Sequence, residues 1–177
     1  MNWRAFGETF VTLFVITDPV GNAPIFVSIT RKLTPRERQV AALRATAAAA
    51  GLIVGFAVFG EVVLRYLHVS LGSLSIAGGL LLLLVALVPL ATPLVAGPGA
   101  IATAIVLWRQ HPGVEGHVAV LLAIVLAVAC VGASLILAER TTRWVSPAVL
   151  AFLTRVFGLL LAAIAVQLVV DGVKSLT

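Results

Sequence analysis

Long apolar runs dominate the chain, and short polar stretches separate them. Six runs can be drawn, and each is close to the roughly 20 residues that a helix needs to cross the hydrocarbon of a bilayer. They cover residues 6–29, 40–64, 71–88, 89–107, 118–138 and 148–170. This pattern predicts an all-α integral membrane protein with six transmembrane helices, which form a single domain over residues 1–177.

The composition agrees with this prediction. Hydrophobic residues make up 61% of the chain and charged residues 11%, and the mean hydropathy is +1.16. Soluble domains carry roughly 25% charged residues, so the expected environment is the lipid bilayer. The net charge of +5 is better explained by the placement of basic loops than by a nucleic-acid partner, and no nucleic-acid binding is expected.

One connection is strongly basic and sets the expected orientation. It runs from Arg31 to Arg38 and contains Thr34-Pro35-Arg36-Glu37, a capping box with proline at the first helical position. The second helix should therefore begin there. Basic loops stay on the cytoplasmic side, so six alternating spans place both termini outside.

The junction between the third and fourth runs has no polar turn. The sequence passes from Val88 directly to Pro89, although two antiparallel spans need a connection that reverses direction. Two explanations stay open: one long bent helix, or a cytoplasmic loop that is missing at 88–89. We favour the missing loop.

The first run carries costly residues at its centre, in the stretch from Thr17 to Phe26. A proline inside a helix costs about 3 kcal/mol or more, and a carboxylate at mid-membrane costs about as much again. Two prolines, a glycine, an asparagine and Asp18 lie within this stretch. We therefore predict that the first helix is broken here, and that the break has a function.

Three features of the first half recur in order in the second half, which predicts two inverted three-helix repeats over about 1–88 and 89–177. Pro19 and Pro24 recur as Pro93 and Pro98, Glu61 recurs as Glu139, and Gly78 recurs as Gly158. The fourth helix should then be broken like the first. In inverted-repeat transporters, such paired breaks near the bilayer midplane form the substrate site.

The two breaks predict a site for a small zwitterion. Helices should restart at Ala23-Pro24 and Gly97-Pro98, where free amides and the positive end of the helix dipole favour a carboxylate. Gly97 and Gly99 permit close approach. Asp18 should attract a cation, a proton or a hydrogen-bond donor. Small residues, among them Ala23, Ala96 and Ala100, indicate a small substrate.

Alternatives stay open for two of these residues. Asp18 is either a structural residue that caps amides around Gly21 and Asn22 or a functional carboxylate, the default for ionisable groups in a membrane. Gln167 is either interhelical packing or a cavity residue.

Two stretches resemble the signatures of the MarC family of bacterial and archaeal membrane proteins. Residues 18–26, DPVGNAPIF, resemble its first-helix signature, and residues 89–101, PLATPLVAGPGAI, resemble its fourth-helix signature; residues 165–167 with 171–172 resemble the end of its last helix. The resemblance covers nearly the whole chain. It implies six helices in inverted repeats, an inner-membrane location and, as for some relatives, transport of small neutral amino acids such as glycine and alanine. The family has a longer connection between its third and fourth helices.

The sequence thus predicts a secondary transporter or exporter, with coupling to H⁺ or Na⁺ left open and no other cofactor. The expected substrate-binding residues are Asp18, Pro19, Gly21, Asn22, Ala23, Pro24, Thr92, Pro93, Ala96, Gly97, Pro98 and Gly99, with Thr17 and Gln167 as further contacts and no metal ligand. Alternatives are efflux of drugs or other small metabolites, a channel, and a membrane protein without transport activity. An enzyme is not expected, because the chain has no His-Glu-x-x-His and no Gly-x-Ser-x-Gly motif. The oligomeric state is left open.

Overall fold

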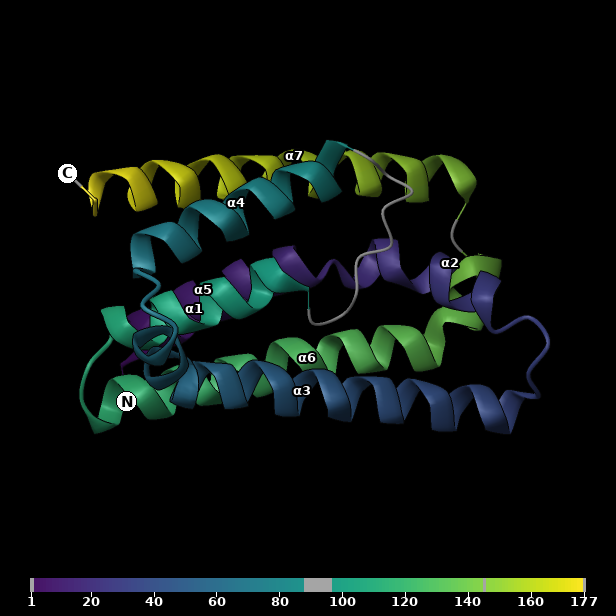
Figure 1. Ribbon diagram of the computed structural model, residues 1–177. Coiled ribbons are helices and arrows are strands. Elements are labelled where there is room, and N and C mark those ends of the chain that lie inside the picture. The colour runs from purple at the N-terminus through teal and green to yellow at the C-terminus, as the bar shows by residue number, and fades with distance from the viewer. Residues whose placement is uncertain (1, 88–96, 145, 177) are drawn as a thin grey trace.

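The computed structural model describes residues 2–87, 97–144 and 146–176, and within these ranges the chain is helical, with seven α-helices and no strand (Figure 1). The helices are α1 Trp3–Thr17, α2 Pro19–Ile29, α3 Pro35–Tyr66, α4 Leu71–Leu87, α5 Pro98–Gln110, α6 Val114–Trp144 and α7 Pro147–Lys174. The predicted all-α class is confirmed for this part of the chain. The junction at 88–89 and the start of the predicted fourth helix lie outside the described residues.

The start of α3 follows the predicted capping box. Glu37 N–H donates to Thr34 Oγ1 at 3.3 Å, and Thr34 N–H donates back to Glu37 Oε2 at 2.9 Å. Pro35 occupies the first helical position, where its missing N–H leaves no hydrogen bond unmade. The sequence prediction for this helix start is therefore confirmed.

Four stretches in the described residues are long and apolar enough to cross a membrane: Trp3–Ile29, Pro35–Tyr66, Val114–Ala138 and Ala148–Lys174. The first of them contains both α1 and α2. Leu71–Ala86 is apolar but shorter. Large apolar side chains lie on the outside of the bundle, such as Phe59 at 65% exposure and Phe152 at 64%. Apolar surface of this extent is expected where a protein faces lipid.

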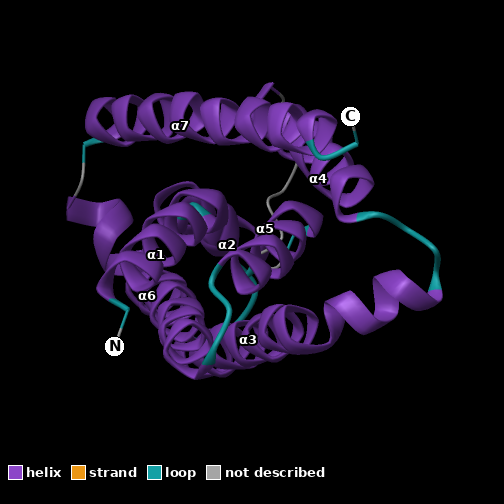
Figure 2. Cartoon of the chain, turned by 90° about the vertical axis from the view of Figure 1, so that its left-hand side faces the viewer, coloured by secondary structure: helices purple, strands orange, loops and turns teal. Residues whose placement is uncertain are grey.

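The helices pack in three layers. Helices α4 and α7 lie side by side in one layer, α1, α2 and α5 lie in the middle, and α3 and α6 form the third layer (Figures 1 and 2). A buried core of Leu13, Ile53, Val120 and Ile124 joins α1, α3 and α6. The start of α1 and the end of α7 lie at the same end of the bundle in Figure 1.

Glycines bring α4 and α7 into close contact. A Cβ atom on Gly79 would lie 2.6 Å from the carbonyl oxygen of Ala165, and one on Gly172 would lie 2.7 Å from that of Gly72. Small residues at helix interfaces permit such backbone approach in lipid, where no hydrophobic effect drives helices together. The α4–α7 layer is consequently a closely packed pair.

Candidate functional site

The first span is interrupted at a single residue, Asp18. Helix α1 ends at Thr17 and α2 begins at Pro19, and Asp18 between them has φ 36° and ψ 71°, in the left-handed region. Proline disfavours the α conformation of the residue before it, which favours an end of α1 before Asp18. Aspartate is one of the few residues that tolerate the left-handed conformation. The Asp18-Pro19 pair therefore sets the position of the break.

Side chains satisfy the backbone groups that the break releases. Asp18 Oδ1 accepts from Gly21 N–H at 2.9 Å and so caps α2. The Asn22 side-chain amide donates to Thr17 O at 2.6 Å, which is a carbonyl at the end of α1. The Thr17 hydroxyl donates to Leu13 O at 2.7 Å. A buried polar group left without a partner costs about 1–3 kcal/mol. These hydrogen bonds remove that cost for the backbone groups they pair, and so stabilise the break within the span.

The predicted restart of the first helix at Ala23-Pro24 is wrong. Pro24 lies inside α2, and the restart is at Pro19. Both prolines lack an N–H, but only Pro19 follows a residue that can turn left-handed and cap the new helix with its side chain. Ala23 has no such side chain. The cap around Gly21 that was left open for Asp18 is present.

The second restart lies where the sequence predicts it. Helix α5 begins at Pro98, and Gly97 precedes it in an extended conformation with φ −70° and ψ 162°. Gly99 is buried, and a Cβ atom there would collide with the side chain of Leu82 on α4. In this structure, the small size of Gly99 serves helix packing. Thr92, Pro93 and Ala96 lie outside the described residues.

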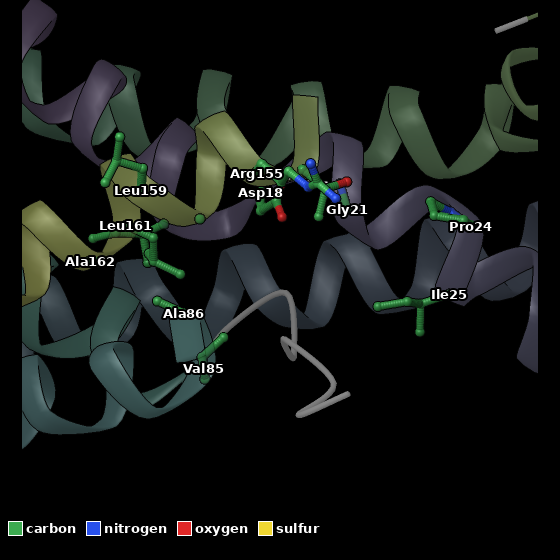
Figure 3. Close-up of a pocket in the computed structure, with 13 residues that line it drawn as sticks. Asp18, Gly21, Pro24, Ile25, Val85, Ala86, Arg155, Leu159, Leu161 and Ala162 are labelled. Carbon is green, nitrogen blue, oxygen red and sulfur yellow. Dashed lines mark hydrogen bonds between the residues drawn. The ribbon is translucent and has the colours of Figure 1, made fainter. Parts of the chain in front are cut away.

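A cavity of about 580 Å³ opens beside the break in the first span (Figure 3). Three of the predicted site residues line it: Asp18, Gly21 and Pro24. Its other described lining residues come from α1, α2, α4 and α7, and they are Ile16, Ile25, Val85, Ala86, Thr154, Arg155, Gly158, Leu159, Leu161 and Ala162. The cavity is therefore largely apolar, with one acidic and one basic side chain among these residues.

The other predicted residues do not line this cavity. Those of the first break, namely Thr17, Pro19, Asn22 and Ala23, are buried in the protein around it. Gly97, Pro98 and Gly99 at the start of α5 are also absent from its lining.

Gln167 is likewise absent from the lining of the cavity. It donates from its side-chain amide to Asp171 Oδ1 at 2.8 Å, in an exposed bond along α7.

Sequence reasoning missed Arg155 as a site residue. It stands inside the predicted span 148–170, but it is not among the predicted site residues. An arginine at the centre of a membrane helix costs about 2.5–3.5 kcal/mol on insertion scales, and such residues face interiors or cavities. A single charge inside an apolar run was the signal that identifies it.

These features define a class of protein: an integral membrane protein whose first span is broken beside a charged, largely apolar cavity. The model of the MarC family of integral membrane proteins matches residues 3–87 and 85–177. The chain belongs to the MarC family.

The chain is also similar to UPF0056 membrane proteins over almost their whole length. A UPF0056 membrane protein of Methanocaldococcus jannaschii is 32% identical, covering 99% of this chain and 98% of the relative. One from Archaeoglobus fulgidus is 34% identical, over 96% and 92% of the two chains. The UPF0056 inner membrane protein YhgN of Escherichia coli is 32% identical over 93% of each. No solved structure matches the chain significantly.

Proposed function

We propose that this protein is a secondary transporter of small neutral amino acids that works by alternating access. The observation that carries the proposal is the break at Asp18, which places a carboxylate beside a cavity within a membrane span. Carboxylates in spans are expensive and mark transport pathways by default. Asp18 binds the substrate ammonium or a coupling H⁺ or Na⁺, and the proposal includes no enzymatic step and no other cofactor.

The same proposal includes six spans in two inverted repeats. The first repeat holds α1 with α2, then α3 and α4; the second holds α5, α6 and α7. The helix contacts support this division, because exchanging the repeats maps them onto one another. The α1–α6 contact becomes α3–α5, the α1–α7 contact becomes α4–α5, and the pairs α3–α6 and α4–α7 map onto themselves.

A loop missing at 88–89 is part of this proposal. The two matches to the family model meet at residues 85–87, which supports an interruption there. The alignment with the Methanocaldococcus jannaschii relative spans 202 positions, whereas this chain has 177 residues. At least 25 positions, the difference between these lengths, thus have no counterpart in this chain.

The proposed location is the inner membrane, with both termini outside. The Escherichia coli relative is named an inner membrane protein, and the basic connection between α2 and α3 favours the cytoplasmic side for that loop. The start of α1 and the end of α7 at one end of the bundle are consistent with an even number of spans (Figure 1).

One observation favours a second candidate, the efflux of a larger apolar molecule. The cavity of about 580 Å³ falls within the 300–1,000 Å³ typical of sites for drug-sized ligands. Its wall is formed mainly by aliphatic side chains such as Leu159 and Leu161. A glycine-sized substrate would fill only part of it.

A counterflow assay tests both candidates. The purified protein is placed in liposomes loaded with unlabelled compound, and uptake of labelled glycine or alanine is followed with and without H⁺ and Na⁺ gradients. Saturable exchange of an amino acid supports the proposal, and exchange confined to larger apolar compounds supports the second candidate. Flux that does not saturate indicates a channel, and no flux or ligand binding at all indicates a protein without transport activity.

A further inference from the structure

Arg155 and Asp18 line the same cavity from different helices. Arg155 lies on α7, between apolar runs on both sides, and Asp18 lies at the junction of α1 and α2 (Figure 3). Among the described lining residues, Arg155 is the one basic side chain and Asp18 the one acidic side chain. The cavity therefore offers both signs of charge.

Arg155 has no carboxylate partner among the residues that the structure describes. Within the described residues it forms no ion pair with Asp18 or with any other carboxylate at 4.0 Å or less. Its side chain is exposed rather than buried in the helix bundle. A guanidinium stays protonated in proteins, so Arg155 gives the described part of the cavity wall a permanent positive charge.

Asp18 makes the start of α2 a poor site for a substrate carboxylate. Its own carboxylate accepts from Gly21 N–H at 2.9 Å and so already provides the anion at that helix terminus. A second carboxylate there would meet like charge, which is unfavourable. Arg155 is the positive group of the cavity that remains for an anion, and its fork of N–H donors matches a carboxylate.

We propose that Arg155 binds the carboxylate of a zwitterionic substrate in this cavity while Asp18 faces the substrate's ammonium group. The aliphatic wall, with Ile16, Val85 and Leu159, then receives an apolar side chain. This inference rests on the proposed transport of amino acids and deepens it. It moves the carboxylate contact from the helix starts to Arg155, and it extends the substrate class to amino acids with larger apolar side chains.

Binding to the purified full-length protein tests this assignment without depending on flux. The ligands are alanine, leucine, alaninamide, which lacks the carboxylate, and propionate, which lacks the ammonium. The variants are Arg155→Gln and Arg155→Lys. Arg65→Gln is the matched control, because Arg65 is an exposed arginine on α3 that pairs with Glu61 at 3.2 Å, outside the cavity. Thermal unfolding and size-exclusion profiles verify that each variant folds.

The wild type should bind alanine and leucine more tightly than alaninamide, with leucine at least equal to alanine. Arg155→Gln should weaken amino-acid binding by about 10- to 100-fold and leave alaninamide within about twofold. Arg155→Lys should restore part of the loss, and Arg65→Gln should change nothing. If Arg155→Gln misfolds, the affinities of Arg155→Lys for alanine and alaninamide are compared instead. The preference of Arg155→Lys for alanine should then be smaller than that of the wild type.

Two results would overturn the assignment. The first is an unchanged affinity for alanine in Arg155→Gln, which would make Arg155 a contact for lipid headgroups. The second is a wild type that binds alanine and alaninamide equally, or binds neither, which would exclude a carboxylate contact. Wild-type binding that depends on Arg155 but comes without flux in liposomes would instead refute transport and leave the Arg155 contact standing.

Discussion

Helices α4 and α7 contact the neighbouring helices at two interfaces, and these interfaces differ in how tightly they are packed. Where α4 meets α5, a Cβ atom on Gly78 would lie 2.6 Å from Ala102 Cβ, and Gly99 is covered by Leu82. Where α7 meets α1 and α2, a Cβ atom on Gly158 would have nothing within 4 Å, and Gly158 lines the cavity. The proposed inverted repeats pair these interfaces, with Gly158 in the place of Gly78.

In the proposed transporter, this difference identifies the two interfaces that have to change during the transport cycle. Alternating access is largely a rocking of one repeat or bundle against the other around a fixed site. If the repeats exchange conformations, the closed α4–α5 interface opens while the open interface at α7 closes. The asymmetry between the two interfaces is what the proposed cycle requires of one of its end states.

The largest expected effect comes from removing the charge at the open interface. Asp18→Asn should lower the transport rate by about 10- to 100-fold, because a charged contact is lost. Stability should hardly change, since asparagine also tolerates the left-handed conformation and caps helices equally well. Flux in liposomes and thermal unfolding in detergent measure the two effects. Asp171→Asn, on the exposed part of α7, is the control, and normal flux in Asp18→Asn would remove this carboxylate from the mechanism.

A matched glycine pair tests the comparison itself. Gly78→Ala should destabilise the protein by about 1–3 kcal/mol, because the added methyl overpacks the contact with Ala102. Gly158→Ala should be neutral or stabilising by up to about 1 kcal/mol, since alanine favours the helix and meets open space. Denaturant titration of both variants measures the difference. Equal destabilisation would show that the two interfaces are packed alike.

A larger side chain at Gly158 should affect transport and leave stability unchanged. Gly158→Leu projects into the cavity beside Asp18 and should lower flux by about tenfold, which is a typical effect of added bulk in a pocket. Gly55→Leu is the control, because a Cβ atom on Gly55 also meets open space but lies on α3 away from the cavity. Normal flux in Gly158→Leu would place the substrate elsewhere.

The smallest effect is expected at Gln167, which lies on α7 but does not line the cavity. Gln167→Ala removes the exposed bond to Asp171 Oδ1, a side-chain pair of the kind worth about 0.2–0.5 kcal/mol. Flux should stay within about twofold of the wild type, measured in the same liposomes. A loss as large as that of Asp18→Asn would instead extend the substrate site along α7 to Gln167.

Local rules predicted the helix boundaries well. The capping box at Thr34 and the proline at Pro98 both act within one helical turn, so the sequence alone determines them. The break in the first span was predicted for the same reason, but the residue at which the helix restarts was not. Choosing between Pro19 and Pro24 requires knowing which preceding residue can turn left-handed and cap the new helix, and only Asp18 can.

Contacts between helices were harder to predict. Helix α7 is apolar on all sides, so its pattern does not indicate which face turns toward α1 and α2, and Arg155 was not predicted as a site residue. The packing of Gly99 against Leu82 depends on how α4 crosses α5. Neither crossing has a sequence signal in a chain whose lipid-facing and core-facing residues are equally apolar.

The break at Asp18 also bears on how the protein is made. Each hydrogen bond that supports it joins residues at most five positions apart, from Leu13–Thr17 to Thr17–Asn22. No later helix supplies a donor or an acceptor to these bonds. Contacts between residues this close in sequence form early, because little loop-closure entropy is lost. The kink can therefore take shape as soon as the first span enters the membrane during synthesis, before the rest of the chain has emerged from the ribosome.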